Sequence, residues 1–325
     1  MDHLQPQIIR RRYSDFDALA EAAESWDLGL NKLDCTPFYG EALEMISPDF
    51  ILTRGYFNSR MKQEGKPPDG FRTFGVPMNP ALQLLWNGRQ VIGNSFLLAL
   101  PDQSELQAIS DPGFDIFTIS VTERTFLKQA ETMGFHDFGK RFQSLEALQC
   151  DPAGTSRLQD ILLRTERNAS HLFFDYTEAK ERILIELVRL TGSKHSRQTP
   201  LIESSRQRRA IEQTDRYIHA HPDEPPTVKI LCEVTGISKR TLEYAFGNYL
   251  GVSPKAYINA VRLNQVRKHL CAAKPGSILV SEAANIWGFW HMGQFAADYR
   301  KLFGEKPSDT LGQRCRVHQR QQPEL

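Results

Sequence analysis

The chain has 325 residues, 40% of them hydrophobic, and its 40 Lys and Arg nearly balance its 39 Asp and Glu, which gives a formal net charge of +1. This length predicts two domains that can each bury a core. The longest apolar runs fall far short of a membrane span, and the basic run at residues 10–12 precedes no apolar stretch. A membrane-spanning segment and a signal peptide are therefore excluded, and we expect a cytoplasmic protein.

The two parts of the chain differ in charge. Residues 1–205 carry 22 basic against 28 acidic side chains, a balance of −6, whereas residues 206–325 carry 18 against 11, a balance of +7. We therefore expect phosphate binding in the C-terminal part and none in the acidic N-terminal part.

Short apolar runs separated by turn residues fill the stretch from about residue 51 to residue 121. We interpret six of them as strands: 53–57, 73–76, 82–86, 90–92, 96–100 and 114–121. Asn87-Gly88 predicts a tight hairpin, and Asp111-Pro112-Gly113 predicts another turn. Many short strands with turns between them are typical of a β-sandwich or a small barrel.

The N-terminal part carries no pattern of an enzyme. Its histidines are unpaired and lie outside the strand region (His3, His136, His171 and His195). The chain has no nucleophile elbow, P-loop or dinucleotide fingerprint, so we expect neither catalysis nor a metal site. A ligand pocket is the expected use of such a barrel. Its candidate lining is aromatic, although ordinary core packing is the favoured interpretation of each residue taken singly: Tyr56, Phe71, Phe74, Trp86 and Phe96.

The cysteines predict no structural zinc. They are odd in number, widely scattered and without a Cys-x-x-Cys pair: Cys35, Cys150, Cys232, Cys271 and Cys315. Free thiols in a reducing compartment are the simplest interpretation.

Helices are predicted after the strands, at 123–133, 155–168 and 171–190. The third carries an apolar stripe at helical spacing: Leu172, Tyr176, Ala179, Ile183, Leu187 and Leu190. This stripe would either cover the barrel or pair with a second subunit in a homodimer. Polar residues 192–205 are interpreted as a linker, so that residues 1–191 form the first domain. A further helix at 206–221 opens the second domain.

A pattern that occurs twice fills the second domain. Residues 231–246 and 283–299 each predict a short apolar helix, a turn at Gly236 or Gly288, and a second amphipathic helix. Leu242 and Phe295 are 53 residues apart, as are Gly251 and Gly304, whereas the two turn glycines are 52 apart. Ser238 is the expected N-cap of the first copy, and the same region of the second copy holds the weaker cap His291. Two helix-turn-helix units in one basic domain predict binding of double-stranded DNA.

The outward positions of each second helix are the candidates for DNA contact. They are Lys239, Arg240, Glu243 and Tyr244 in the first unit, and His291, Met292, Gln294 and Ala297 in the second. Arg suits guanine, Gln suits adenine, Glu accepts from cytosine, and Met or Ala can contact a thymine methyl group. Polar residues on any surface helix provide the alternative interpretation.

A connecting helix is predicted at 254–270, opened by Pro254 and decorated by Arg262, Arg267, Lys268 and His269. A rigid connector would hold the two reading helices at a fixed separation. Adjacent major-groove segments on one face of DNA lie about 34 Å apart, so one chain could fill both.

Residues 206–312 resemble the DNA-binding domain of the AraC/XylS family of bacterial transcription regulators. The resemblance rests on these segments: 238–242, Phe246, 251–254, 262–263, 288–289, Phe295, 299–304 and 306–308. Within the family, 287–296 together with 298–299 and 305–308 resembles the branch that contains the ethanolamine-utilisation operon activator. The resemblance implies an α+β chain with a cupin-like sensory barrel and flanking helices, an all-α domain with two helix-turn-helix units, and a tail at 313–325.

The resemblance also implies a function. We expect an effector-responsive transcription regulator, an activator that acts with RNA polymerase, and no enzyme. The narrower branch implies ethanolamine as effector, sensed with cobalamin. Two other classes of protein are less compatible with the sequence. An enzyme with a DNA-binding tail, such as an alkyl-transfer repair protein, would need a reactive Pro-Cys-His-Arg run, which the chain lacks. An architectural DNA-binding protein would not need the large acidic N-terminal domain.

Overall fold

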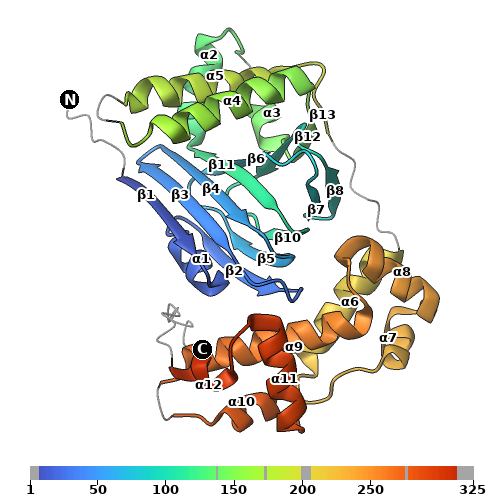
Figure 1. Cartoon of the computed structure of the whole chain (residues 1–325). Coiled ribbons are helices and arrows are strands. Elements are labelled where there is room, and N and C mark those ends of the chain that lie inside the picture. Colours follow the sequence, from blue (N-terminus) through green and yellow to red (C-terminus); the bar gives the residue numbers. More distant parts are fainter. Residues whose placement is uncertain (1–6, 137, 172–173, 199–205, 275–276, 313–325) are drawn as a thin grey trace, which may run out of the picture.

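A computed structural model describes residues 7–312 apart from 137, 172–173, 199–205 and 275–276. The predicted tail and half of the predicted linker lie outside the described residues. Figure 1 shows the layers: helices α2–α5 cover one face of a sheet, a second sheet lies beneath, and the helices α6–α12 form the C-terminal domain below it. Within the described part of the chain, no helix combines the length and apolar character needed to cross a membrane.

Two antiparallel sheets build the N-terminal domain. The larger sheet has the order β1 (Gln7–Tyr13), β3 (Gly40–Ser47), β4 (Phe50–Phe57), β11 (Phe114–Val121), β6 (Arg72–Pro77), β9 (Phe96–Leu100), β12 (Ala147–Gln149) and β13 (Arg197–Gln198). The smaller sheet has the order β2 (Asp27–Lys32), β5 (Met61–Lys66), β10 (Leu106–Ser110), β7 (Gln83–Trp86) and β8 (Arg89–Ile92). The six predicted strands are confirmed. The predicted hairpin joins β7 to β8, with positive φ at Asn87 (41°) and Gly88 (79°).

The prediction of a cupin-like barrel is not confirmed, because neither sheet closes in the described chain. Strands β1 and β13 are the edges of the larger sheet, and β2 and β8 are those of the smaller. The space between the sheets holds packed side chains, including Trp86, Leu98 and the stacked rings of Phe57 and Phe114, whose centroids lie 4.4 Å apart. The strands therefore form two open layers with a filled interior.

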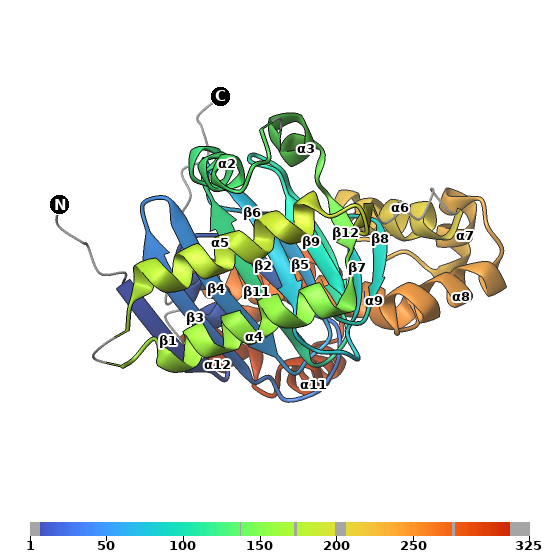
Figure 2. The same cartoon turned by 90° about the horizontal axis from the view of Figure 1, so that it is seen from above.

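Four helices cover the outer face of the larger sheet (Figure 2): α2 (Glu123–Thr132), α3 (Phe138–Ser144), α4 (Pro152–Asn168) and α5 (Tyr176–Gly192). A further helix, α1 (Phe16–Ala22), lies near β2. The predicted stripe of α5 is buried in the chain's own core through Ala179, Ile183, Leu187 and Leu190, while Leu172 lies outside the described residues. The stripe covers the sheet, so a homodimer would have to use another surface.

The C-terminal domain is all helical, as predicted. Its helices are α6 (Arg206–Ala220), α7 (Val228–Thr235), α8 (Lys239–Leu250), α9 (Pro254–Ala272), α10 (Val280–Ile286), α11 (Met292–Phe303) and α12 (Pro307–Gly312). One apolar cluster joins both halves of this domain and includes Leu33 of the N-terminal domain.

The two domains meet along α9 and strand β2. The side-chain amide of Asn264 accepts a hydrogen bond from Lys32 N at 2.9 Å and donates to Lys32 O at 2.8 Å. It thus pairs with an edge strand as a further strand would. This contact fixes how the C-terminal domain sits against the smaller sheet.

Candidate DNA interface

Helices α7 and α8 form the first helix-turn-helix unit. Gly236 ends α7 in the left-handed conformation with φ 65°, which a residue without Cβ adopts at little cost. Ser238 then caps α8 by accepting a hydrogen bond from Thr241 N at 3.2 Å. Leu242 and Phe246 are fully buried, so the face that they occupy packs inside the domain and the opposite face is left to solvent.

Helices α10 and α11 form the second unit, which has the same turn glycine and buried anchors as the first but a different N-cap. Gly288 takes φ 70° at the turn, and Phe295 and Tyr299 anchor α11 in the core. His291 occupies the N-cap but makes no capping hydrogen bond through its side chain, as the sequence predicted. The burial of Leu242 and Phe295 confirms that the repeated positions are equivalent core anchors.

Most of the predicted contact positions are exposed on these two helices. On α8, Lys239, Arg240, Glu243 and Tyr244 are all exposed, and Tyr244 retains 59% of its surface. Lys239 Nζ lies 3.8 Å from Glu243 Oε1, a solvent-exposed ion pair that DNA could replace at little cost. These side chains are placed as a DNA-reading surface requires, and their base contacts stay predictions.

On α11 the predicted positions are less uniform. His291, Gln294 and Ala297 are exposed, whereas Met292 is half-buried against the apolar cluster. Gln294 Nε2 donates to Asp298 Oδ1 at 2.8 Å, so this amide must leave Asp298 before it can form a bidentate contact with adenine.

Sequence reasoning missed Trp290, which lies between the second turn and α11. Its side chain is 65% exposed beside the predicted contact residue His291. The signal was present: the turn glycines are 52 residues apart while the anchors are 53 apart, so one extra residue must sit after the second turn. An exposed indole at that point enlarges the surface available to DNA with a large apolar ring and one N–H donor.

Two of the four basic residues predicted to decorate α9 are buried instead. Arg262 Nε donates to Trp287 O at 2.7 Å and its guanidinium lies 4.1 Å from the centre of the Phe289 ring, where burial lowers its pKa to about 10. Arg267 is only 2% exposed. Both therefore serve the packing of the domain and are unavailable to phosphates.

The carboxylates that neutralise Arg267 come from both domains. Its partners are Asp15, Asp17 at 2.8 Å, and Glu305. Burial alone would lower the pKa of Arg267, but these carboxylates outweigh burial and raise it. The side chain is therefore a permanent cation at the domain boundary.

The aromatic side chains proposed as a ligand lining do not gather in one place. Phe74 faces the helical layer and stacks on Phe126, while Tyr56 lies edge-on to Tyr39. Trp86 and Phe96 share the packed interior between the sheets, and Phe71 is half-buried in the turn before β6. Their role in ligand binding stays a prediction. No group of three metal-binding side chains occurs in the described ranges, and the expected lack of a metal site is likewise left as a prediction.

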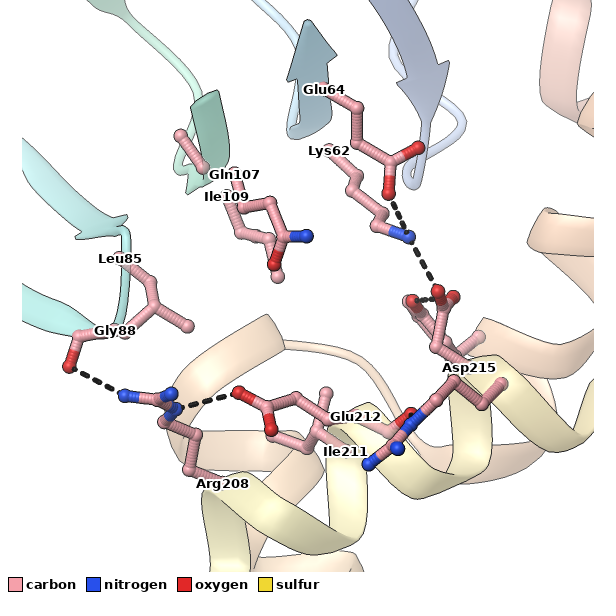
Figure 3. Close-up of a pocket in the computed structure, with 13 residues that line it drawn as sticks. Lys62, Glu64, Leu85, Gly88, Gln107, Ile109, Arg208, Ile211, Glu212 and Asp215 are labelled. Atoms are coloured by element: carbon pink, nitrogen blue, oxygen red, sulfur yellow. Dashed lines mark hydrogen bonds and ion pairs between the residues drawn. The ribbon is translucent and has the colours of Figure 1, made fainter. Parts of the chain in front are cut away.

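A cavity of about 320 Å³ lies between the smaller sheet and α6 (Figure 3). Lys62 from β5 bridges Glu64 at 2.7 Å and Asp215 of α6 at 2.8 Å. Arg208 of α6 pairs with Glu212 at 2.7 Å. Apolar side chains complete the lining: Leu85, Ala108, Ile109 and Ile211. The cavity thus offers charges of both signs and is built by both domains.

Comparisons with known proteins bear on the C-terminal domain. Residues 231–313 match a family model described as a helix-turn-helix domain. A probable thc operon regulatory protein of Rhodococcus erythropolis is 40% identical over 95 residues, which are 29% of this chain and 29% of the relative. A XylDLEGF operon transcriptional activator of Pseudomonas putida is 33% identical over 132 residues, which are 41% of this chain and 39% of the relative. The chain therefore matches well under half of the length of these relatives.

A solved structure gives a match of the same extent. It is a probable AraC family transcriptional regulator from Rhodopseudomonas palustris, 40% identical to this chain, with 33% of this chain and 97% of that chain covered and a TM-score of 0.29. The two repeated units and their buried anchors lie within the stretch that the helix-turn-helix family model matches. Residues 231–313 are therefore a helix-turn-helix domain, similar in sequence to domains of DNA-binding transcriptional regulators.

Proposed function

We propose that this protein is a transcription activator that reads a two-part operator with α8 and α11 and responds to a small-molecule effector through its N-terminal domain. The observation that carries the DNA-binding part is the pair of repeated units, in which equivalent side chains are buried and most of the predicted contact positions are exposed. The name of the P. putida relative supports activation, in which RNA polymerase would be the partner.

Arg240 tests the reading function because Arg at an exposed position of a reading helix can bind guanine bidentately. Replacing Arg240 by Ala should weaken binding to the preferred duplex by about 1–3 kcal/mol and relax the choice of base at one position. The preferred duplex is first selected from random sequences with the wild-type protein, and affinities are then measured by fluorescence anisotropy at a fixed salt concentration.

Lys229→Ala is the matched control, since it removes one exposed positive charge from α7, outside the predicted contact positions. It should lower affinity equally for selected and scrambled duplexes. An Arg240→Ala protein that discriminates between the two duplexes as well as the control does would remove Arg240 from the reading surface. A wild-type protein that selects no sequence would contradict the function itself.

The effector is proposed to bind in the cavity between the domains, since the interior of the sandwich is filled. A ligand there touches Glu64 of one domain and Glu212 of the other, and so can favour one placement of the DNA-binding domain. The side chains of Glu64 and Glu212 are 42% and 40% exposed, and their carboxylates suit a small ammonium ion. Ethanolamine, which the resemblance of residues 287–296 suggests, fits this chemistry.

Calorimetric titration of the full chain with ethanolamine, with and without cobalamin, tests the effector. Saturable binding that Glu64→Gln weakens at least about tenfold is expected, because the loss of one charge-assisted hydrogen bond is worth that much. Glu105→Gln, which alters an exposed carboxylate in the loop just before β10, should bind as the wild type does. The absence of saturable heat under both conditions would rule out ethanolamine and leave the DNA-binding function untouched.

A further inference from the structure

Both reading helices end at the same kind of position. Helix α8 stops at Gly251 with φ 61°, and α11 stops at Gly304 with φ 81°. The last carbonyl groups of a helix have no partner within the helix and carry the negative end of its dipole. Each reading helix therefore presents an electron-rich end, away from the N-terminal residues that face DNA in the proposed function.

The N-terminal domain places one cation on each of these ends. Arg60 Nη1 donates to Leu250 O of α8 at 2.6 Å, and Lys32 Nζ donates to Leu302 O of α11 at 3.0 Å. Leu250 is the last residue of α8 and Leu302 is the last but one of α11, so each contact falls in the last turn of a reading helix, although the two positions are not equivalent in the repeat. The N-terminal domain thus binds both α8 and α11 through carbonyl groups at their C-terminal ends.

The two cations come from one site, which we name the cation pair. Lys32 is the last residue of β2, Arg60 immediately precedes β5, and Leu33 N donates to Arg60 O at 3.0 Å. Asp34 fixes both: its carboxylate accepts from Arg60 N at 2.6 Å, and its backbone oxygen accepts from Lys32 Nζ at 2.5 Å. A movement of this site would therefore act on α8 and α11 together.

Two domains can be held together without the positive charges of the cation pair. The side chain of Lys32 is 2% exposed, and burial lowers its pKa although Asp34 opposes this. A buried ammonium is costly, and an apolar residue of the same size would pack as well. A cation is needed only where a carbonyl end must be held in one direction.

We propose that Lys32 and Arg60 are positioning residues that fix α8 and α11 relative to each other, so that both reach the operator in register. This inference rests on the proposed reading function. The predicted contact residues other than the half-buried Met292 stay exposed while the pair is engaged, and this supports the engaged state as the one that binds DNA. Loss of the pair frees the two units and removes the advantage of binding both sites at once.

The double variant Lys32→Met/Arg60→Met tests the inference in the full chain. Affinity is measured for the selected duplex and for a duplex in which the base pairs read by α11 are scrambled. The variant should bind the intact duplex about tenfold more weakly and the half-scrambled duplex as tightly as the wild type, because only the coupling of two sites is lost. The control Arg124→Met/Lys128→Met removes the same charges from exposed positions of α2 and should change neither affinity.

Three results would overturn the inference while the wild type still selects a sequence: unchanged affinity of the double variant for the intact duplex, tighter binding, or an equal loss on both duplexes. If the double variant does not fold, Arg60→Met decides by the same criteria, because Arg60 is partly exposed and its loss leaves no buried charge. Arg60→Lys should restore most of the affinity for the intact duplex. A wild type that selects no sequence would instead be a failure of the proposed function.

Discussion

Gly236 and Gly288 hold the same place in the two units, yet their surroundings differ. Both have positive φ, but a Cβ at Gly236 would meet no atom within 4 Å, whereas one at Gly288 would lie 2.6 Å from Asp223 O and 2.9 Å from Pro225 Cδ. Gly236 is thus required by its backbone conformation alone. Gly288 is required by that conformation and by the close approach of a neighbouring backbone.

Alanine substitutions should separate these two requirements. Gly236→Ala should lower the free energy of unfolding by about 1–2 kcal/mol, the cost of a left-handed conformation for a residue with Cβ. Gly288→Ala should cost clearly more, because the backbone of residue 223 must also move. Denaturant unfolding of both variants measures the difference, and equal losses would show that the crowding at Gly288 relaxes freely.

The burial of charged side chains could not be predicted from the sequence. Arg262 and Arg267 stand among exposed-looking polar residues of α9, and nothing in their spacing marks them as internal. Their burial depends on Trp287, Phe289, Asp15 and Asp17, which come from distant parts of the chain. The contact positions of α8 were predictable because one short amphipathic helix decides which residues face outward.

At the scale of elements, prediction succeeded where an element is apolar on one face or on both. The helices of the C-terminal domain and the apolar strands β6, β9 and β11 follow that pattern. Strands β1 and β5 were missed because their sequences, QIIRRRY and MKQEGK, are largely polar. Strand β1 is an edge strand, and β5 turns Lys62 and Glu64 toward the other domain, so tertiary contacts outweigh local preference in both.

At the scale of the whole molecule, the Lys62–Asp215 pair links the domains through titratable groups. Burial alone would raise the pKa of Asp215, but Lys62 outweighs it and holds that pKa below its ordinary value of 3.8. Burial would lower the pKa of Lys62, and Asp215 and Glu64 more than reverse this, so that pKa lies above 10.5. Because its pKa is lower in the folded state, Asp215 stabilises that state above pH 3.8, and this stabilisation is lost as the pH falls through the folded-state pKa.

Lys62, whose pKa is raised in the folded state, has the opposite dependence: its contribution to stability is complete below pH 10.5 and is lost as the pH rises through its folded-state pKa. Wild type and Lys62→Met should therefore differ most in unfolding free energy near neutral pH, and this difference should shrink on acidification, starting above pH 3.8 because burial without Lys62 raises the pKa of Asp215 in the variant. Urea titrations at several pH values measure it. Lys66→Met, an exposed change on the same strand, should show no such dependence, and a difference for Lys62→Met that grows on acidification would contradict the assigned pair.

The arrangement of the domains could not be foreseen from the sequence. Each domain has its own recognisable pattern, but the cavity between them joins distant residues such as Lys62 and Asp215, and the contact of α9 with β2 joins Lys32 and Asn264, which are 232 positions apart. The predicted separation of α8 and α11 by one turn of DNA stays a prediction for the same reason, since it depends on how these domains are held.

The pairing of Asn264 with Lys32 also bears on how the protein could be divided. Strand β2 is the last strand of its sheet, and this amide shields its outer backbone groups from other chains. The N-terminal domain produced without the helical domain would expose these donors and acceptors, which could then pair with strands of other chains. In this fold, contact with the helical domain therefore protects the N-terminal domain from aggregation through strand β2.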